Sequence, residues 1–278
     1  MVLRVRGVVL PEREERTFWI DDGGVLRTEP VAGAETVVDG GWLLPGLVDT
    51  HTHPGTDALD VPFSDGQLRK DLLDHRDAGV LLVRTPGTAA RMPAWVDGDV
   101  ELPRVRSAGR WLATPGRFFP GVGRDIELKD LTAAAVEEAR ASGGWCKVVG
   151  DWRWDDAPVP LELLSATVEA VHAAGGKVAV HCQTEEGSRN AVLAGADSLE
   201  HGMHLPAELL DRMAAQGTAL VPTLSVFAGS ARRTRRAVET SAPRAAEAPR
   251  PRRRGAGLRT GSLPPRVAIR CKRTCRRS

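Results

Sequence analysis

Two histidines two positions apart, His51 and His53, are the residues of this chain best suited to bind a metal ion. They end an apolar segment that reads PGLVDTHTHPG from Pro45 to Gly55. Successive side chains of a strand point to opposite faces, so histidines two residues apart point the same way. Two imidazoles on one face at the end of a strand can bind a single metal ion. The pair therefore predicts half of a metal site.

Three later segments each place a candidate metal ligand near the end of an expected strand. Lys147 lies in GWCKVVG, His181 in KVAVHC and His201 in DSLEHG. The chain runs 94 residues from His53 to Lys147, then 34 and 20 residues to the two later histidines. These intervals accommodate whole strand–helix units, and barrels of such units collect functional residues at the carboxyl ends of their strands. We therefore expect these residues and the first pair to meet at one site.

The elements that must position these residues alternate between strands and helices from residue 42 onward. Glycines follow the expected helices and β-branched segments follow the glycines, which is typical of repeated strand–helix units. Such repetition predicts an α/β fold with a parallel sheet, most simply a TIM (β/α)-barrel of about seven strands that lacks the eighth. The expected strands cover residues 42–49, 80–85, 103–109, 145–150, 177–182, 197–202 and 219–224, and the expected helices cover residues 68–78, 128–141, 161–174, 186–194 and 207–216.

Together these motifs resemble the amidohydrolase superfamily, in its imidazolonepropionase-like and prolidase-like branch. The resemblance rests on PGLVDTHTH, GVLLVRTPG, the lysine of GWCKVVG, VAVHCQTEEGSRNAVLAGADSLEHG and ALVPTL, and it covers roughly residues 2–228. The short strands before residue 43, with a hairpin expected at Asp22-Gly23-Gly24, resemble the small β-sandwich of that family. We therefore expect a partial β-sandwich at 1–43, an incomplete barrel with the metal site at 44–228 and a tail at 229–278.

The resemblance implies a binuclear metal centre, which we expect to hold two zinc ions. His51 and His53 would bind one ion, His181 and His201 the other, and Lys147 would bridge both as a carbamate formed with CO2. An ammonium cannot bind a cation, whereas a carbamate is an anion with two oxygens. Imidazole-rich sites suit zinc, and other divalent metals remain alternatives. The implied reaction is hydrolysis of an amide or other C–N bond, in a cyclic amide or dipeptide-like substrate, by a metal-activated hydroxide.

One residue that the resemblance leads us to expect is absent. In the family an Asp at the end of the eighth strand binds metal and moves the proton, and the last Asp of this chain is Asp211, before the seventh expected strand. The segment Gly55-Thr56-Asp57-Ala58 matches the motif that carries this Asp in the family. It follows His53 by only a few residues, so we interpret the match as a coincidence. No general base is therefore assigned. The alternative function is an inactive amidohydrolase remnant that still binds metal.

Residues expected near the mouth of the site are candidates for substrate binding. Arg84 ends the second expected strand and either faces the pocket or forms a salt bridge. Trp152, Arg153 and Trp154 follow the fourth expected strand, where they either select substrate or pack within a loop. His204 follows the sixth expected strand, either at the mouth of the site or in a loop.

Charge is divided sharply between the body of the chain and its tail. Residues 231–278 contain 15 Arg and one Lys against two Glu, whereas the other 230 residues carry a net charge of −12. The tail has no apolar period and cannot bury enough surface to offset the entropy of ordering, so we expect disorder. Its Arg, Ala, Pro and Gly have GC-rich codons, which favours a frameshift as its origin. A natural solvated tail and a nucleic-acid arm that contacts phosphates are the alternatives.

Composition argues against two further classes of protein. The chain has no apolar run of 18 residues, so no membrane-spanning helix is expected, and its first apolar segment is too short for a secretory signal. Four cysteines without a framework spacing indicate a reducing compartment. We therefore expect a cytoplasmic enzyme with a small-molecule substrate.

Overall fold

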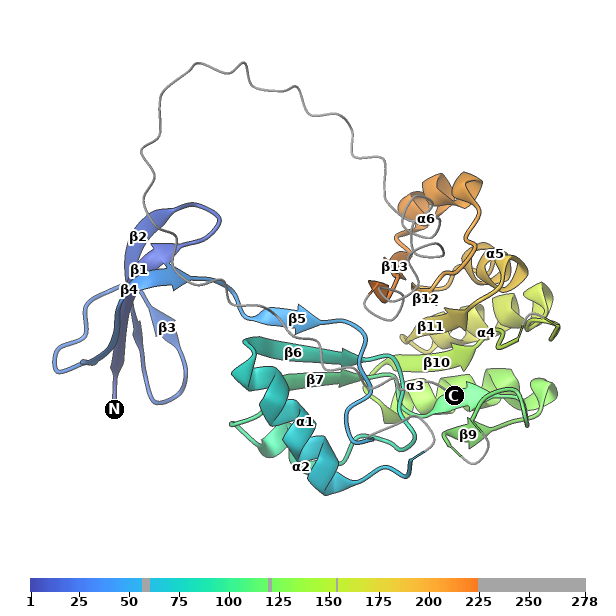
Figure 1. Ribbon diagram of the computed structural model, residues 1–278, viewed down its shortest axis with the longest axis horizontal. Helices are drawn as coiled ribbons and strands as arrows, with labels where there is room; N and C mark the ends of the chain where they lie inside the picture. Colours follow the sequence, from blue (N-terminus) through green and yellow to red (C-terminus); the bar gives the residue numbers. More distant parts are fainter. Residues whose placement is uncertain (57–60, 120–121, 154, 225–278) are drawn as a thin grey trace, which may run out of the picture. The chain divides into compact units, whose positions relative to one another are not determined.

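The computed structural model describes residues 1–56, 61–119, 122–153 and 155–224 (Figure 1). The chain divides into two compact units, Met1–Leu47 and Val48–Ser278. The tail expected at 229–278, together with Asp57 and Trp154, lies outside the described residues. Within the described ranges, no helix is long and apolar enough to cross a membrane.

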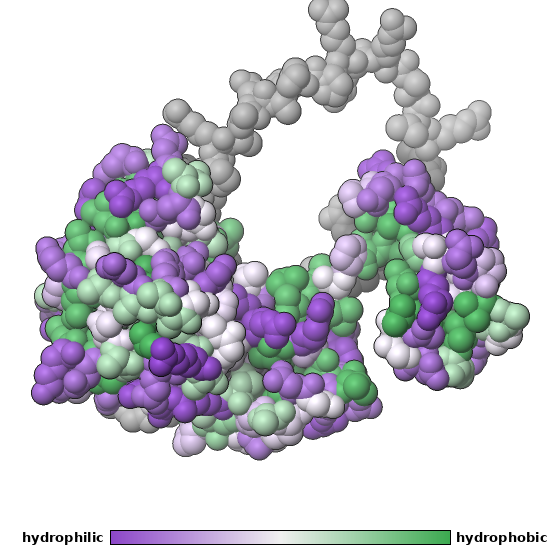
Figure 2. All heavy atoms as spheres, turned by 180° about the vertical axis from the view of Figure 1, so that it is seen from behind, coloured by the Kyte–Doolittle hydropathy of each residue, from purple (hydrophilic) through white to green (hydrophobic). Residues whose placement is uncertain are grey.

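The first unit is a four-stranded sheet in the order β3-β2-β1-β4. Its strands are β1 (Leu3–Val9), β2 (Glu14–Ile20), β3 (Leu26–Arg27) and β4 (Glu35–Leu43). The predicted turn connects β2 to β3, where the Asp21 carboxylate accepts hydrogen bonds from the backbone N–H groups of Gly23 and Val25. Apolar side chains remain on the surface beside charged ones (Figure 2), and Trp42 is 62% exposed.

One expectation for this part of the chain is corrected, and another stays a prediction. A complete β-sandwich needs two sheets packed face to face, and the described residues of the first unit form a single sheet, so the partial β-sandwich expected at 1–43 stays a prediction. The strand expected at 42–49 is divided, because β4 continues through Leu43 and pairs in parallel with β1. Pro45, which has no N–H to donate to a ladder, separates β4 from the short β5 (Leu47–Asp49).

Strands and helices alternate through most of the second unit, and the ladders described from residue 80 onward are parallel. Three strands form one sheet in the order β5-β6-β7, and six form another in the order β13-β12-β11-β10-β8-β9. The strands are β6 (Val80–Thr85), β7 (Arg104–Ser107), β8 (Trp111–Ala113), β9 (Arg124–Asp125), β10 (Trp145–Val149), β11 (Lys177–Cys182), β12 (Ser198–His201) and β13 (Ala219–Val221). The helices are α1 (Asp65–Asp77), α2 (Trp95–Gly98), α3 (Leu131–Ala141), α4 (Leu161–Ala173), α5 (Glu185–Leu193) and α6 (Leu210–Gln216), with 3-10 turns at Leu128–Asp130 and Ala207–Leu209.

The described strands do not close the expected barrel. β5 and β13 stand at the outer ends of the two strand orders. The strand expected at 103–109 corresponds to β7, which ends at Ser107. β8 was not expected, and it begins after a break at residues 108–110 that contains a bridge between Thr88 and Arg110. Gly109 makes this break with a φ of 70°, a conformation that glycine adopts without steric cost.

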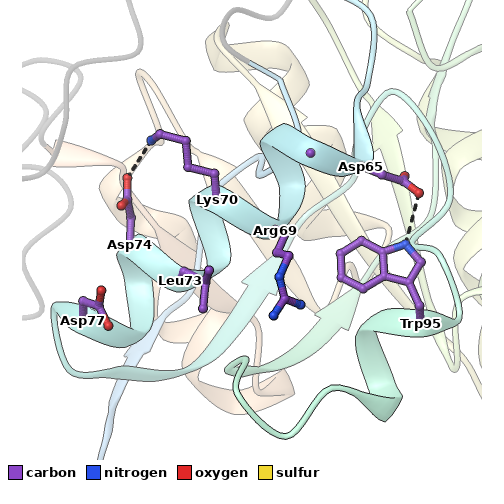
Figure 3. A pocket seen from close by; sticks show the side chains of 8 residues that line it. Asp65, Arg69, Lys70, Leu73, Asp74, Asp77 and Trp95 are labelled. Carbon is purple, nitrogen blue, oxygen red and sulfur yellow. Dashed lines mark hydrogen bonds and ion pairs between the residues drawn. The ribbon is translucent and has the colours of Figure 1, made fainter.

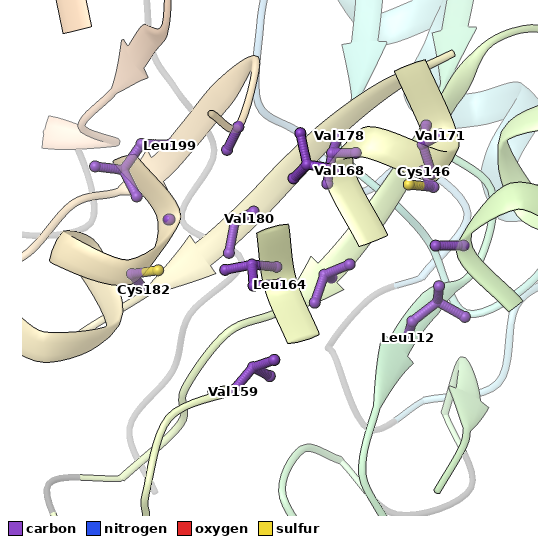
Figure 4. Packing of buried hydrophobic residues seen from close by; sticks show 14 of the residues in the cluster. Leu112, Cys146, Val159, Leu164, Val168, Val171, Val178, Val180, Cys182 and Leu199 are labelled. Atoms are coloured by element: carbon purple, nitrogen blue, oxygen red, sulfur yellow. The ribbon is translucent and has the colours of Figure 1, made fainter. Parts of the chain in front are cut away.

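Helices and the six-stranded sheet bury a common apolar core (Figure 4). Cys146 and Cys182 are fully buried in this core, as strand alternation predicts when Lys147 and His181 face the opposite side. The remaining core side chains seen in Figure 4 include Leu112, Val159, Leu164, Val168, Val171, Val178, Val180 and Leu199. The core therefore fixes which face of each strand is left for chemistry.

Candidate functional site

The five residues predicted to bind metal are brought together within the second unit. His51 and His53 follow β5, Lys147 lies in β10, His181 lies in β11 and His201 ends β12. The ring centroids of His51 and His53 are 5.1 Å apart, those of His51 and His201 are 4.9 Å apart, and those of His181 and His201 are 4.6 Å apart. The four imidazoles therefore form one continuous cluster, and the Lys147 side chain is buried close enough to influence their titration.

Hydrogen bonds hold the Nδ1 atoms of the first two histidines. His53 Nδ1 lies 2.7 Å from the carbonyl oxygen of Gly87, which can only accept. His51 Nδ1 lies 2.6 Å from Oε2 of Glu200, a fully buried carboxylate. An acceptor at Nδ1 places the ring proton there and leaves the Nε2 lone pair for another partner. Metal-binding histidines in proteins are typically oriented by such an acceptor.

The two later histidines complete the cluster in different ways. His201 Nδ1 lies 2.7 Å from Thr223 Oγ1. Among the described residues, His181 Nε2 and Arg84 Nη2 are the buried side-chain polar atoms that have no hydrogen-bond partner. A buried polar atom without a partner is costly, so the orphaned nitrogen of His181 indicates a position where a ligand would be stabilised.

Burial controls the protonation of the cluster. It lowers the pKa of every one of the four histidines, to about 3 for His53. Burial also lowers the pKa of Lys147, to about 8, because the ammonium loses its hydration. The imidazoles are thus neutral at pH 7, which is the form that binds metal ions, and the lysine amine is easier to deprotonate than an exposed one.

Backbone strain is concentrated where β12 ends. His201 has a φ of 65°, and its hydrogen-bond partner Thr223 has a φ of 46°. A left-handed conformation costs roughly 1–2 kcal/mol at a non-glycine residue and persists where the surroundings enforce it, often at functional sites. Regular strand alternation would direct the His201 ring to the core side, as it does for Leu199. With the left-handed conformation, the ring instead lies beside His51.

Arg84 is held inside this unit and does not project freely into a pocket. Its Nη1 lies 2.8 Å from Glu200 Oε1 and 3.2 Å from the carbonyl oxygen of Thr50, and its guanidinium lies 4.5 Å from the centroid of the Trp145 ring. The salt-bridge alternative therefore describes Arg84, and a direct role in substrate binding is not supported by its contacts.

Trp152 contributes to an aromatic cluster beside the histidines. Its ring centroid lies 5.3 Å from that of His181, 4.8 Å from that of Phe118 and 5.3 Å from that of Phe119. Trp152 also lines a hollow of about 440 Å³ formed by the loops that follow β8 and β10. Its neighbour Arg153 is exposed, so of the two only Trp152 reaches both the hollow and the histidines.

The remaining predicted residue, His204, and a second surface hollow are distinct from the histidine cluster. His204 is exposed in the turn after β12, with a φ of 56°. A separate surface hollow of about 680 Å³ is lined by α1 and Trp95, where Trp95 Nε1 donates to Asp65 and Lys70 pairs with Asp74 (Figure 3). That hollow contains none of the residues predicted to do chemistry.

This chain matches part of the length of its sequence relatives. No protein-family model matches the chain. An uncharacterized protein of Mycobacterium tuberculosis is 41% identical over 235 residues, which cover 80% of this chain and 61% of that protein. An imidazolonepropionase of Acidiphilium cryptum is 27% identical over 263 residues, which cover 78% of this chain and 64% of that protein. The chain thus spans about three fifths of the length of these relatives.

Solved structures resemble the chain in fold. A Xaa-Pro dipeptidase with bound methionine matches with a TM-score of 0.65 and 22% identity, covering 81% of this chain and 67% of that one. An amidohydrolase matches with a TM-score of 0.63 and 21% identity, covering 84% of this chain and 69% of that one. The chain has the amidohydrolase fold. The resemblance that the sequence motifs predicted is thereby confirmed.

The amidohydrolase fold implies a divalent metal ion, and the donor chemistry of the site fits one. In the part of the chain that the structure describes, no three His, Cys, Asp or Glu side chains are grouped with the geometry to hold an ion. The fit comes from the neutral imidazoles, from the acceptors at Nδ1 of His51 and His53, and from the orphaned Nε2 of His181. All three features leave nitrogen lone pairs for a cation.

Three residues that contact histidines of the candidate site were missed in the sequence: Gly87, Glu200 and Thr223. Glu200 could have been found, because Leu199 beside it is apolar and strand alternation then turns Glu200 toward the site. Gly87 and Thr223 act through a backbone carbonyl and through a hydroxyl on a strained residue. Neither carries a signal in the residue pattern.

Proposed function

We propose that this chain is a metal-dependent hydrolase of an amide or other C–N bond, and that its substrate is a cyclic amide or a dipeptide-like molecule. His51, His53, His181 and His201 would hold two zinc ions, and Lys147 would bridge them as a carbamate. The observation that supports the proposal most directly is the continuous cluster of four buried imidazoles, one of which, His181, has an Nε2 without a hydrogen-bond partner. The names of the matched relatives, an imidazolonepropionase and a Xaa-Pro dipeptidase, support the same class of bond.

Each part of the site would make a separate contribution. Bound metal would polarise the scissile carbonyl and lower the pKa of water. The acceptors at Gly87 and Glu200 keep His53 and His51 in the tautomer that binds a cation through Nε2. Burial of Lys147 favours its neutral amine, the form that adds CO2. Trp152 and its aromatic neighbours would contact an apolar part of the substrate.

The test measures metal content and hydrolysis on the full 278-residue chain. Metal per chain is determined by inductively coupled plasma mass spectrometry, and turnover is assayed on Xaa-Pro dipeptides, N-acyl amino acids and cyclic amides. We expect metal to co-purify, and a chelator to abolish turnover until zinc is restored. Hydrolysis that is insensitive to chelation would contradict the proposal, and metal binding without turnover would favour the inactive remnant.

A pair of histidine variants separates site effects from general damage. His181→Asn removes the orphaned nitrogen and should reduce both metal content and turnover at least tenfold. His172→Asn is the matched control, because His172 is 43% exposed on α4, where its Nε2 lies 2.8 Å from Asp197. Equal effects of the two substitutions would remove the support for His181 as a ligand.

A further inference from the structure

Glu200 is a completely buried carboxylate whose two oxygens have different partners. Oε1 accepts hydrogen bonds from Arg84 Nη1 at 2.8 Å and from Ser198 Oγ at 2.6 Å. Oε2 faces His51 Nδ1 at 2.6 Å. Glu200 is the register neighbour of His181 in the β11–β12 ladder and directly precedes His201, so it adjoins two candidate ligands. Oε1 is thus anchored by the surrounding structure, whereas Oε2 is directed at the candidate metal site.

A salt bridge holds Glu200 in its carboxylate form. Its Oε1 lies 2.8 Å from Nη1 of Arg84, and a guanidinium stays charged in proteins. Arg84 is itself fixed by the Thr50 carbonyl and the Trp145 ring. An ionised carboxylate only accepts hydrogen bonds, so the proton in the contact with His51 must reside on Nδ1.

We propose that Glu200 is the positioning residue of His51: Oε2 holds the ring proton on Nδ1 and keeps Nε2 as the metal-binding nitrogen, while Arg84 and Ser198 anchor Oε1. The inference rests on the proposed function, since it concerns how one of the candidate ligands is prepared. Carboxylates that accept from the far nitrogen of a metal-binding imidazole raise its basicity and fix its orientation.

Replacement of Glu200 by Gln should invert the tautomer of His51. Arg84 and Ser198 are both donors toward Oε1, so the amide oxygen of Gln would occupy that position. Its NH2 group would then face His51 Nδ1 and would require an acceptor there, which moves the ring proton to Nε2. A wrong histidine tautomer of this origin is enough to disable a site whose geometry is otherwise intact.

The experiment observes the tautomer directly, by 15N-histidine NMR of the metal-free full chain at a pH where His51 is neutral. The His51 signals are assigned by their loss in His51→Gln. We expect Nδ1–H in the wild-type chain and in Glu200→Asp, which keeps the acceptor, and Nε2–H in Glu200→Gln. Zinc affinity, from competition with a chromophoric chelator, should fall by about 10- to 100-fold in Glu200→Gln.

The matched control is Glu138→Gln, which removes an equally buried and arginine-paired carboxylate that has no histidine contact. It should leave the His51 tautomer and the zinc affinity unchanged, and an equal loss in this control would overturn the inference. Nε2–H at His51 in the wild-type chain would overturn it even if Glu200→Gln does not fold. The predicted tautomers together with an absence of hydrolysis would sustain the inference and contradict the proposed enzymatic function.

Discussion

Replacing Glu138 by Gln should destabilise the second unit by about 3 kcal/mol at neutral pH. Glu138 lies on α3 with no solvent exposure, and its carboxylate accepts hydrogen bonds from Arg91, Arg110 and Arg124. Burial would raise its pKa, but the hydrogen bonds from the arginines lower it to about 2 from the ordinary 4.5. That difference is worth about 3 kcal/mol, at about 1.4 kcal/mol for each tenfold change in the proton equilibrium.

The dependence on pH gives this prediction its sign. Because the folded-state pKa of Glu138 lies below the unfolded-state value, its stabilisation is complete above about pH 4.5 and is lost as the pH falls toward 2. Gln does not titrate, so the difference in unfolding free energy between the wild-type and variant chains isolates Glu138. That difference should shrink by about 1.4 kcal/mol between pH 7 and about pH 3.5, where only the unfolded state has taken up the proton.

Urea denaturation followed by tryptophan fluorescence, repeated across this pH range, measures the effect. Glu137→Gln is the matched control, because Glu137 is the next residue on α3 and pairs with Arg91 and Arg124 but is 54% exposed. Its removal should change stability little, since solvent screens exposed ion pairs. A difference for Glu138→Gln that does not vary with pH, or an equal cost for Glu137→Gln, would refute this account of the buried cluster.

Three other substitutions probe residues around the candidate site. His75 Nε2 lies 3.3 Å from Asp49 Oδ2, and this contact raises the pKa of His75. The pairing therefore stabilises the fold below pH 6.5, and the stabilisation is lost as the pH rises through the folded-state pKa. His75→Gln and the wild-type chain should differ in urea stability at about pH 6 and converge by about pH 9. Gly87→Ala would place a Cβ 2.8 Å from Trp111 Cδ1 at a φ of 111°, and thermal denaturation should register a loss of about 1–3 kcal/mol. Trp152→Ala should raise KM more than it lowers kcat for any amide that the chain hydrolyses, and a purely kcat effect would contradict its assignment to substrate contact.

Local chemistry accounts for the parts of the fold that could be predicted. Strands follow glycines, helices begin at capping side chains such as Thr184, and alternation assigns Lys147 and His181 to one face and Cys146 and Cys182 to the other. Each of these properties depends on residues close together in sequence. Closure of a barrel instead depends on pairing between the first and last strands, which no short segment encodes, and the described strands of the second unit remain two sheets.

The end of β12 illustrates why the site itself was only partly predictable. Leu199 packs in the apolar core, so strict alternation directs Glu200 toward the site and returns His201 to the core side. The left-handed φ of 65° at His201 breaks that alternation and lets two consecutive residues approach the His51 ring. A pattern of period two can identify one of them, and the other depends on a strained conformation that only the folded surroundings enforce. Strand alternation assigns Glu200 to the site, and His201 is the exception to that alternation. Both residues contact the His51 ring, so the buried carboxylate belongs to the candidate site together with His201.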